Sequence, residues 1–508
     1  MSKLVYSGIS DLVGLGGPHA RLDPLERGTA NTAFTAHAAA GRVYALSEDS
    51  APFEITVSAD GAVASKGYER FDGNLRHAVT AHPKYDPASE ELLLIGYDLT
   101  SADRDVTYSV VDAKGTVVRS VDIKLLEGKA MMHDWAVTKT RGVLLDCPLR
   151  FQPEAMLTSD DGQVFQFDES GAVRIGVFPR AMSNQDEIVW IDAAPPSNDR
   201  AGGSDGAPIS PDDDGSEAHA AHAFFSFHTI SAWDDEDGRV VLTAMRMPSF
   251  KMDFELSEVN RNTVVYQWTI DVDERRVVSS RPIFETPCEF PVINEAYVGK
   301  RHRYAYVALQ GPRLFNGMAK LDLVAGCEVS RITWPSDSLE SGEFVFAPRI
   351  GSIDEDDGYL LGIVSDTRDK TSTLIVLDAR DIAAGPAARI ALPHRVPHGL
   401  HSKWLSREAL DVHLACQRHE HPGPTKAKPS SHLDVEAFWS RVTALTSETP
   451  TQDRSSDQST AHAAMLDTRE VTRNATRQVG MLATKGMLTL VDADPHPPGN
   501  SRRRSGVL

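Results

Sequence analysis

Four histidines with distinctive neighbours lie at the ends of predicted β-strands, and together their imidazoles could hold a metal ion. They are His82 in TAHPK, His133 in MMHDW, His228 in FHTISAWDD and His401 in PHRVPHGLH. Tens of residues or more separate them, so no local zinc-type motif joins them. A histidine at the start of a propeller strand can direct its ring towards the axis where several sheets converge. Taken alone, any one of the 18 histidines would more often be held by an ordinary neighbour.

The elements that must position these histidines are short β-strands. From Gly28 onwards, runs such as 32–36, 43–46 and 53–57 alternate with Gly, Asp and Ser turns. One short strand every 8 to 12 residues is typical of an all-β sandwich, barrel or propeller. Few long helical periodicities occur before residue 405, and no close repeat is visible. We therefore expect an all-β protein and, if it is a propeller, one whose blades have diverged in sequence.

Composition limits the classes of binding partner and the cellular compartment expected for the protein. The formal net charge of −20 argues against nucleic acid or an anionic membrane as a general partner. The four cysteines are far apart and show no CxxC, which favours reduced thiols in an intracellular, cytoplasmic protein. The first twenty residues do not resemble a signal peptide, and no apolar run is long enough to predict a transmembrane segment.

Two segments interrupt the strand pattern. Residues 195–221 are rich in Gly, Ser, Asp and Pro and are predicted to be a disordered surface insertion. Residues 409–508 are polar and irregular, and we expect them to form a largely disordered C-terminal tail. The remaining residues, 1–408, are interpreted as one β-domain.

Six segments, in order, resemble the carotenoid cleavage oxygenase family, which includes carotenoid, apocarotenoid, stilbene and lignostilbene dioxygenases and the retinoid isomerases. They are TAHPKYDP, GKAMMHDWAVTKTRGVLLD, FHTISAWDD, CEFPVINEAYVGKRHRYAY, SGEFVFAP and PHRVPHGLHSKW, and the resemblance extends from about Gly28 to Trp404. It implies a seven-bladed β-propeller with non-haem Fe(2+) on its axis. By motif position the iron ligands resemble His82, His133, His228 and His401, whereas His398 lies three residues too early and is interpreted as a loop residue.

The family also places three glutamates behind the ligands, and the matching positions are Glu48, Glu289 and Glu343. Their chemistry suits the role. A ligating imidazole must be neutral, and its other nitrogen then carries a proton that needs an acceptor. A buried carboxylate supplies that acceptor and offsets part of the charge of the iron.

The resemblance implies a reaction as well as a site. Imidazole is a suitable ligand for ferrous iron, and four neutral ligands leave open positions for O2. In the family, O2 and a conjugated C=C bond react to give two carbonyl products, with electrons from the alkene and no added reductant. The implied partner is an apolar conjugated small molecule, and contact with a membrane surface for its uptake stays open. Four aromatic residues are candidates for lining the substrate tunnel, although core packing would explain each one equally well: Trp135, Phe224, Phe227 and Phe290.

Some positions depart from the family pattern. Trp135 stands where members usually have Phe, and Ser231 where they commonly have Asn. The stretch from Glu48 to Pro52 resembles the stilbene-cleaving branch, yet Ser47 occupies the place of a lysine that engages hydroxystilbenes there. Relatives also have a longer segment before the equivalent of Gly28, so we expect an N-terminally truncated chain with an incomplete, weakly stable ring.

Two alternatives to an active dioxygenase follow from these patterns. One is a non-catalytic propeller that keeps the metal site but only binds an apolar ligand. The other is a calcium- or zinc-dependent hydrolase on a propeller. The second would need carboxylate-rich ligands, and the predicted axis supplies histidines instead.

Overall fold

The computed structural model describes residues 24–26, 32–158, 163–194, 223–251 and 262–420. Within these ranges the chain consists mainly of β-strands, as the all-β prediction requires. The predicted insertion at 195–221 and the tail from residue 421 onwards lie outside the described residues.

Most strands form antiparallel sheets of four, built from consecutive strands except in the third, where the β11–β12 hairpin intervenes. The first sheet consists of β1 (Ala33–His37), β2 (Arg42–Leu46), β3 (Phe53–Val57) and β4 (Val63–Tyr68). The second consists of β5 (Lys84–Asp86), β6 (Glu91–Tyr97), β7 (Val106–Val111) and β8 (Val117–Ile123). The third consists of β9 (Ala136–Val137), β10 (Arg141–Asp146), β13 (Arg174–Pro179) and β14 (Val189–Asp192). The fourth consists of β15 (Thr229–Asp234), β16 (Val240–Arg246), β17 (Val264–Asp271) and β18 (Arg276–Phe284).

The remaining strands form one larger sheet that contains two further units of four. One unit consists of β19 (Cys288–Val292), β20 (Tyr304–Gln310), β21 (Phe315–Asp322) and β22 (Cys327–Thr333). The other consists of β23 (Leu339–Pro348), β24 (Gly358–Asp366), β25 (Thr371–Asp378) and β26 (Pro386–Ala391). A single residue pair, Phe315 with Ser341, joins the two units between β21 and β23. A small hairpin of β11 (Leu149–Phe151) and β12 (Phe165–Phe167) extends from the third sheet.

The helices are few and short, apart from the last one. The α-helices are α2 (Ala155–Thr158) and α4 (Arg407–Glu420), and the 3-10 helices are η1 (Pro24–Glu26), η2 (Gln185–Glu187), η5 (Glu295–Tyr297) and η6 (Ile382–Ala384). Among the described helices, none has the length and apolar character needed to cross a membrane.

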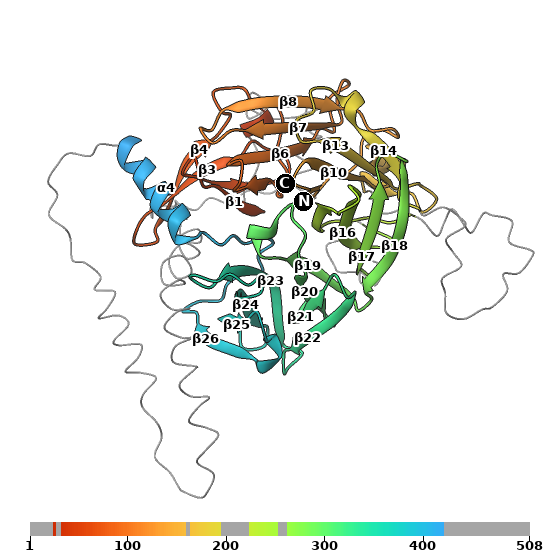
Figure 1. The fold of residues 1–508 in the computed structure, drawn as a ribbon. Coiled ribbons are helices and arrows are strands. Elements are labelled where there is room, and N and C mark those ends of the chain that lie inside the picture. Colours follow the sequence, from red (N-terminus) through yellow and green to blue (C-terminus); the bar gives the residue numbers. More distant parts are fainter. Residues whose placement is uncertain (1–23, 27–31, 159–162, 195–222, 252–261, 421–508) are drawn as a thin grey trace, which may run out of the picture.

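Figure 1 shows the six four-stranded units following one another around a common centre, with β8, β18, β22 and β26 at the periphery. Residue burial fits this arrangement. The six residues of β7 are all buried because both faces of an inner strand are covered, whereas the edge strand β22 alternates between exposed and half-buried residues. The described residues contain six such units and no sheet that closes on itself, so the expected count of seven is not confirmed.

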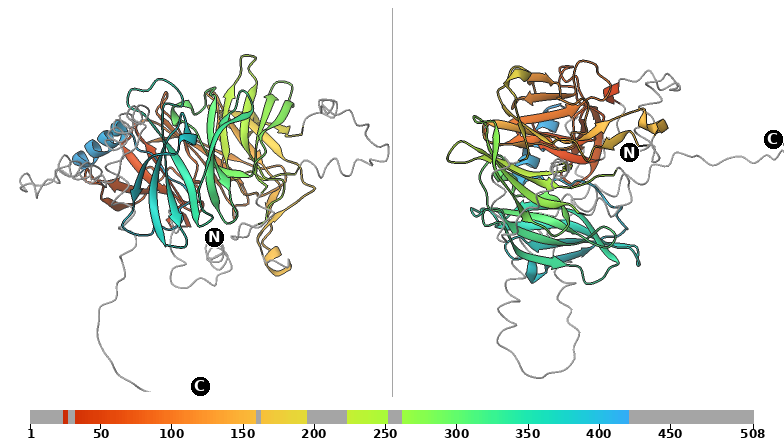
Figure 2. Two further views of the ribbon diagram at one scale, coloured as in Figure 1. Left: turned by 90° about the horizontal axis from the view of Figure 1, so that it is seen from below. Right: turned by 90° about the vertical axis from the view of Figure 1, so that its right-hand side faces the viewer.

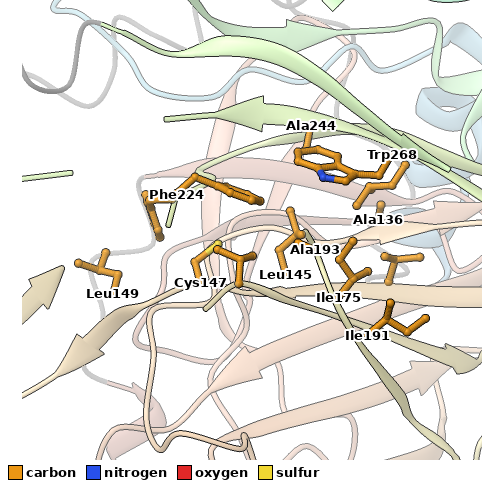
Figure 3. Close-up of a cluster of buried hydrophobic side chains, with 14 of the residues drawn as sticks. Ala136, Leu145, Cys147, Leu149, Ile175, Ile191, Ala193, Phe224, Ala244 and Trp268 are labelled. Carbon is orange, nitrogen blue, oxygen red and sulfur yellow. The ribbon is translucent and has the colours of Figure 1, made fainter. Parts of the chain in front are cut away.

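Hydrophobic clusters fill the spaces between consecutive sheets and hold them at fixed positions. The largest lies between the third and fourth sheets, where Phe224 stacks on Trp268 with ring centroids 5.4 Å apart (Figure 3). Similar clusters join the first to the second sheet, the second to the third, the fourth to the fifth unit, and the fifth to the sixth. Because every sheet is packed on both faces, strand ends near the centre cannot move independently of one another.

The last and first units are joined by residues 392–406, which we call the closing strap. Two adjacent strap residues face opposite ways: Trp404 packs against the cluster of β23–β25, and Leu405 packs with Ala36 and Val43 of the first sheet. The backbone N–H of His401 also donates to the carbonyl of Thr32, just before β1. The strap therefore carries the last predicted ligand across the junction between the two ends of the described ring.

Helix α4 follows the strap and packs on the first sheet, beside β1–β4 in the left view of Figure 2. Leu410 and His413 are both buried, one helical turn apart. His413 Nδ1 donates to the Gly41 carbonyl over 2.8 Å, and its Nε2 accepts from Val57 N over 2.9 Å. The boundary expected at residue 408 thus falls inside a packed helix, and residues 409–420 form most of it.

Candidate metal centre

The structure brings the four predicted ligand histidines together from four different parts of the ring. Three precede the first strand of a sheet: His82 before β5, His133 before β9 and His228 before β15. His401 lies on the closing strap. The Nε2 atoms of His82 and His133 are 3.0 Å apart, and those of His133 and His228 are 3.3 Å apart. His228 and His401 are also separated by 3.3 Å, and all four ligand atoms lie within 4.8 Å of one another.

These nitrogens have the spacing that a metal ion needs, and two of the rings have an acceptor for their Nδ1 proton. Imidazole–metal bonds of about 2.1 Å place ligand nitrogens at right angles about 3 Å apart. His228 Nδ1 donates to Glu289 over 2.6 Å, and His401 Nδ1 donates to Glu343 over 3.1 Å. Since a carboxylate only accepts, each neutral ring then directs the lone pair of Nε2 into the cluster. Lone pairs that face one another at 3.3 Å repel, and a cation among them converts this repulsion into coordination.

Each predicted glutamate lies beside a different histidine, as the motif positions imply. Glu289 is in β19, Glu343 is in β23, and Glu48 follows β2 with its Oε1 atom 3.1 Å from His133 Nδ1. The Glu48 contact is within ion-pair distance but lacks the alignment of a hydrogen bond. Glu48 Oε1 also accepts from the backbone N–H of Ala81, the residue before His82, over 3.1 Å.

The electrostatic environment differs among the four rings. Burial, reinforced by the other rings, holds the pKa of His82 well below its usual range. Burial also lowers the pKa of His401, more than Glu343 raises it. At His228 burial is outweighed by the Glu289 carboxylate, with help from Asp134, so its pKa is raised. A metal ion therefore competes most directly with a proton at His228, because only the neutral ring can bind it.

Sequence reasoning did not identify Asp134 as part of the site. Its side chain is buried, and Oδ1 accepts from Lys84 Nζ and from Trp135 N, both over 2.7 Å. Its Oδ2 accepts from the backbone N–H of Thr229 over 2.7 Å and from the Thr229 hydroxyl over 2.9 Å. Asp134 follows His133 directly and Thr229 follows His228, so one carboxylate fixes the backbone beside two ligands. The signal available in the sequence was an acidic residue directly after a predicted ligand histidine.

Two of the four aromatic candidates border the histidine cluster. The ring of Phe227 lies 5.3 Å from that of His133, and the ring of Phe290 lies 5.6 Å from those of His228 and His401. Phe290 adopts a φ of +50°, a left-handed conformation that bulky residues rarely take. Its N–H meets the Glu289 carboxylate, so the strained backbone keeps ring and carboxylate beside the same histidine.

The other two candidates pack away from the cluster. Phe224 stacks on Trp268 between the third and fourth sheets, with the Arg246 guanidinium 5.3 Å from its ring. Trp135 is fully buried and stacks on Phe178, with ring centroids 6.3 Å apart. Core packing, the alternative reading of these aromatics, describes both placements, and substrate contact by any of the four stays a prediction.

The four-stranded units around four converging histidines define a class of β-protein whose central residues could hold a metal ion. Comparison with known proteins identifies the family. Residues 3–197 and 203–406 match the family model described as retinal pigment epithelial membrane protein. The chain therefore belongs to this family, the carotenoid cleavage oxygenases, as the ordered motifs predict.

Curated relatives carry the same family signature. The chain is 31% identical over 400 residues to carotenoid 9,10(9′,10′)-cleavage dioxygenase 1 of Arabidopsis thaliana, covering 75% of this chain and 68% of that protein. It is 31% identical over 402 residues to carotenoid 9,10(9′,10′)-cleavage dioxygenase of Crocus sativus, covering 75% and 67%. The shared region thus extends over about two thirds of each relative.

Solved structures agree with this assignment. The lignostilbene dioxygenase of Pseudomonas brassicacearum superimposes with a TM-score of 0.60 at 26% identity, covering 74% of this chain and 75% of that one. The cobalt-substituted apocarotenoid oxygenase of Synechocystis gives 0.58 at 25% identity, covering 73% of each chain. The family thus includes both carotenoid-type and stilbene-type relatives of this chain, and a member that accepts a metal other than iron.

Proposed function

We propose that this protein is a non-haem Fe(2+) dioxygenase that cleaves a conjugated C=C bond with O2 to give two carbonyl products. The substrate class is a carotenoid, an apocarotenoid or a stilbene-type compound. The observation that carries the proposal is the convergence of four imidazole Nε2 atoms, with a glutamate carboxylate beside Nδ1 of three of the four rings. The names of the relatives support catalysis over the alternative of a propeller that only binds an apolar ligand.

Four imidazoles, one from each of His82, His133, His228 and His401, would hold the iron. Bound Fe(2+) would supply the reaction with O2. The side chains of the protein would orient the ligands. Glu289 and Glu343 hold the Nδ1 protons of His228 and His401, so that these rings would bind the metal in their neutral form. Neutral ligands leave the charge of a divalent ion intact. The glutamates beside the rings, together with the buried Asp134, would offset part of that charge.

The aromatic residues beside the histidines would position the substrate. Phe227 and Phe290 present apolar rings next to His133, His228 and His401. A flat conjugated ligand that packs on such rings is oriented by its shape, and it excludes water from the reacting bond. The sequence departure at Ser47 leaves the choice between stilbene and carotenoid substrates to experiment.

The test is a product screen with labelled oxygen. Protein reconstituted anaerobically with Fe(2+) is mixed with stilbenes, carotenoids and apocarotenoids under 18O2, and carbonyl products are analysed by mass spectrometry. A dioxygenase places one labelled oxygen in each of the two products. His401→Ala is expected to lose iron and products, whereas His398→Ala, in the same strap, should retain both. Iron-loaded protein that gives no carbonyl product from any of these compounds would refute the proposal and favour ligand binding alone.

Three expectations outside the site stay predictions. They are the cytoplasmic location, the peripheral contact with a membrane for substrate uptake, and the division of the chain into a β-domain at 1–408 and a tail. Cell fractionation and vesicle flotation of the tagged full-length protein address the first two. Limited proteolysis addresses the third because packed segments resist proteases. Cuts are expected in the predicted insertion at 195–221 and beyond α4, and they would move the boundary from residue 408 to the end of the helix.

A further inference from the structure

His82 differs from the other three ligand histidines in how it is held. Glutamates face Nδ1 of His133, His228 and His401. Among the described residues, no carboxylate faces Nδ1 of His82. The structure holds this residue through its backbone instead. Its carbonyl accepts a hydrogen bond from the indole Nε1 of Trp135 over 3.1 Å.

The Trp135 side chain is fixed firmly enough to act as an anchor. It is fully buried, lies nearly parallel to the Phe178 ring at an interplanar angle of 6°, and meets the edge of Tyr108 at 5.7 Å. Its backbone is held as well, because its N–H donates to Asp134 Oδ1 over 2.7 Å. The indole N–H therefore projects from a packed, doubly held residue, and it reaches from the third sheet to the ligand that precedes the second.

We propose that Trp135 is a positioning residue for His82, and that its indole N–H holds the backbone of this ligand, whereas the glutamates hold the rings of the others. A hydrogen bond to the carbonyl limits rotation of the His82 backbone, which fixes the direction of its Cα–Cβ bond and narrows the positions that the ring can take before metal arrives. Such preorganisation lowers the cost of ordering the ligand on binding. Phenylalanine, the residue expected at this position from the family pattern, could also pack against Phe178 but is smaller and could not donate.

The proposal uses the metal site of the proposed function but not its reaction, so metal binding alone can test it. Co(2+) serves as the probe, since its absorption spectrum reports the coordination geometry. Trp135→Phe is compared with Trp334→Phe, a matched control. Trp334 Nε1 donates to the Ser341 hydroxyl over 3.2 Å, and it packs in the cluster between the fifth and sixth units. Both changes remove one indole hydrogen bond, but only the first is linked to a ligand.

Trp135→Phe is expected to weaken Co(2+) binding about 2- to 10-fold in a chelator competition, the range of one neutral hydrogen bond, and to alter the cobalt spectrum. Trp334→Phe should change the dissociation constant by less than about 2-fold, although both variants lose stability in urea. An unchanged constant and spectrum for Trp135→Phe, or an equal shift for both variants, would overturn the proposal. Unmodified protein that fails to bind Co(2+) would instead refute the metal site and the proposed function.

A second variant covers the case in which Trp135→Phe does not fold. Phe178→Leu keeps the indole N–H but removes the ring that stacks on it, so the anchor becomes looser. The same fall in Co(2+) affinity is expected, of about 2- to 10-fold at most, since one hydrogen bond is weakened. A dissociation constant equal to that of the unmodified protein would count against positioning by Trp135.

Discussion

Replacing Asp134 with Asn is expected to destabilise the metal-free protein by about 3–5 kcal/mol, the range for removing one partner of a buried charge pair. Asp134 is only 6% exposed, and each of its oxygens accepts two hydrogen bonds. Asparagine has the same shape but presents NH2 in place of one oxygen. Either Lys84 and Trp135 N, or both donors of Thr229, then lose their acceptor.

The size of the effect follows from these contacts. Hydrogen bonds to a charged group contribute about 1.5–3 kcal/mol each, so two lost bonds remove about 3–6 kcal/mol. The Lys84 side chain is 18% exposed, and water can therefore solvate part of its unpaired charge. This places the expected loss in the lower part of that range. Since the free energy of unfolding of a typical protein is about 5–15 kcal/mol, the change removes a large share of the total stability.

Urea unfolding of the metal-free protein measures this loss as a shift of the midpoint at constant slope. Lys84→Met and the double variant complete a thermodynamic cycle. The double variant should be more stable than the sum of the single losses predicts, by about 1–3 kcal/mol, because the two side chains share one buried contact. Lys84→Met leaves the carboxylate with its backbone donors, so it should cost less than Asp134→Asn.

Asp411→Asn is the matched control for this change. Asp411 pairs with Arg407 across one turn of α4, and both side chains are at least 60% exposed. Exposed pairs of this kind contribute about 0.3–0.5 kcal/mol. A loss below about 1 kcal/mol for Asp134→Asn, or a strictly additive cycle with Lys84→Met, would show that the carboxylate does not fix this part of the ring.

Two further predictions concern single side chains. Burial lowers the pKa of His77 to about 4, and the neutral ring donates from Nδ1 to the Ala78 carbonyl while accepting from the Ser109 hydroxyl. The unfolded state therefore binds a proton near pH 6.5, whereas the folded state does so only near pH 4. The contribution of His77 to the free energy of unfolding is complete above pH 6.5 and falls by about 3 kcal/mol towards pH 4. His77→Gln should remove this part of the pH dependence in urea titrations. Glu289→Gln should weaken Co(2+) binding about 10- to 100-fold. The effect should exceed that of Glu48→Gln, because Glu289 makes an aligned hydrogen bond to its histidine and Glu48 does not. Equal effects of the two variants in a chelator competition would contradict this order.

The sequence alone was sufficient to group the residues of the site. Six motifs in family order single out His82 and His401 although most of the chain lies between them, and no spacing rule could have joined these two. The structure places the four histidines and the glutamates side by side. Motif order works here because the motifs of the first three histidines precede the first strand of a sheet and that of His401 lies on the closing strap, and all four converge at the centre.

Side-chain direction was beyond the reach of the sequence. Trp135 follows His133 by two residues, which in a regular strand would place both on one face. Strand β9 begins only at Ala136, however, so the alternation does not apply and the indole turns into the core. The helix α4 was missed for a different reason: its mean character is polar, and only Leu410 and His413 show a buried face. Two buried positions among residues 407–418, the part of the helix whose burial is described, give too weak a periodicity to detect.

The closing strap sets the order in which the metal centre can form during folding. His401 reaches the other ligands only after the sheets at both ends of the described ring have come together across residues 392–406. The contacts between ligand rings join residues 51, 95 and 173 positions apart, which implies a high contact order and slow folding. Each doubling of such a loop adds only about 0.6 kcal/mol of closure entropy. A metal ion that bound all four rings would crosslink distant parts of the chain only after this slow folding step. Because that crosslink would have to break before the ends of the described ring could separate, it would slow unfolding.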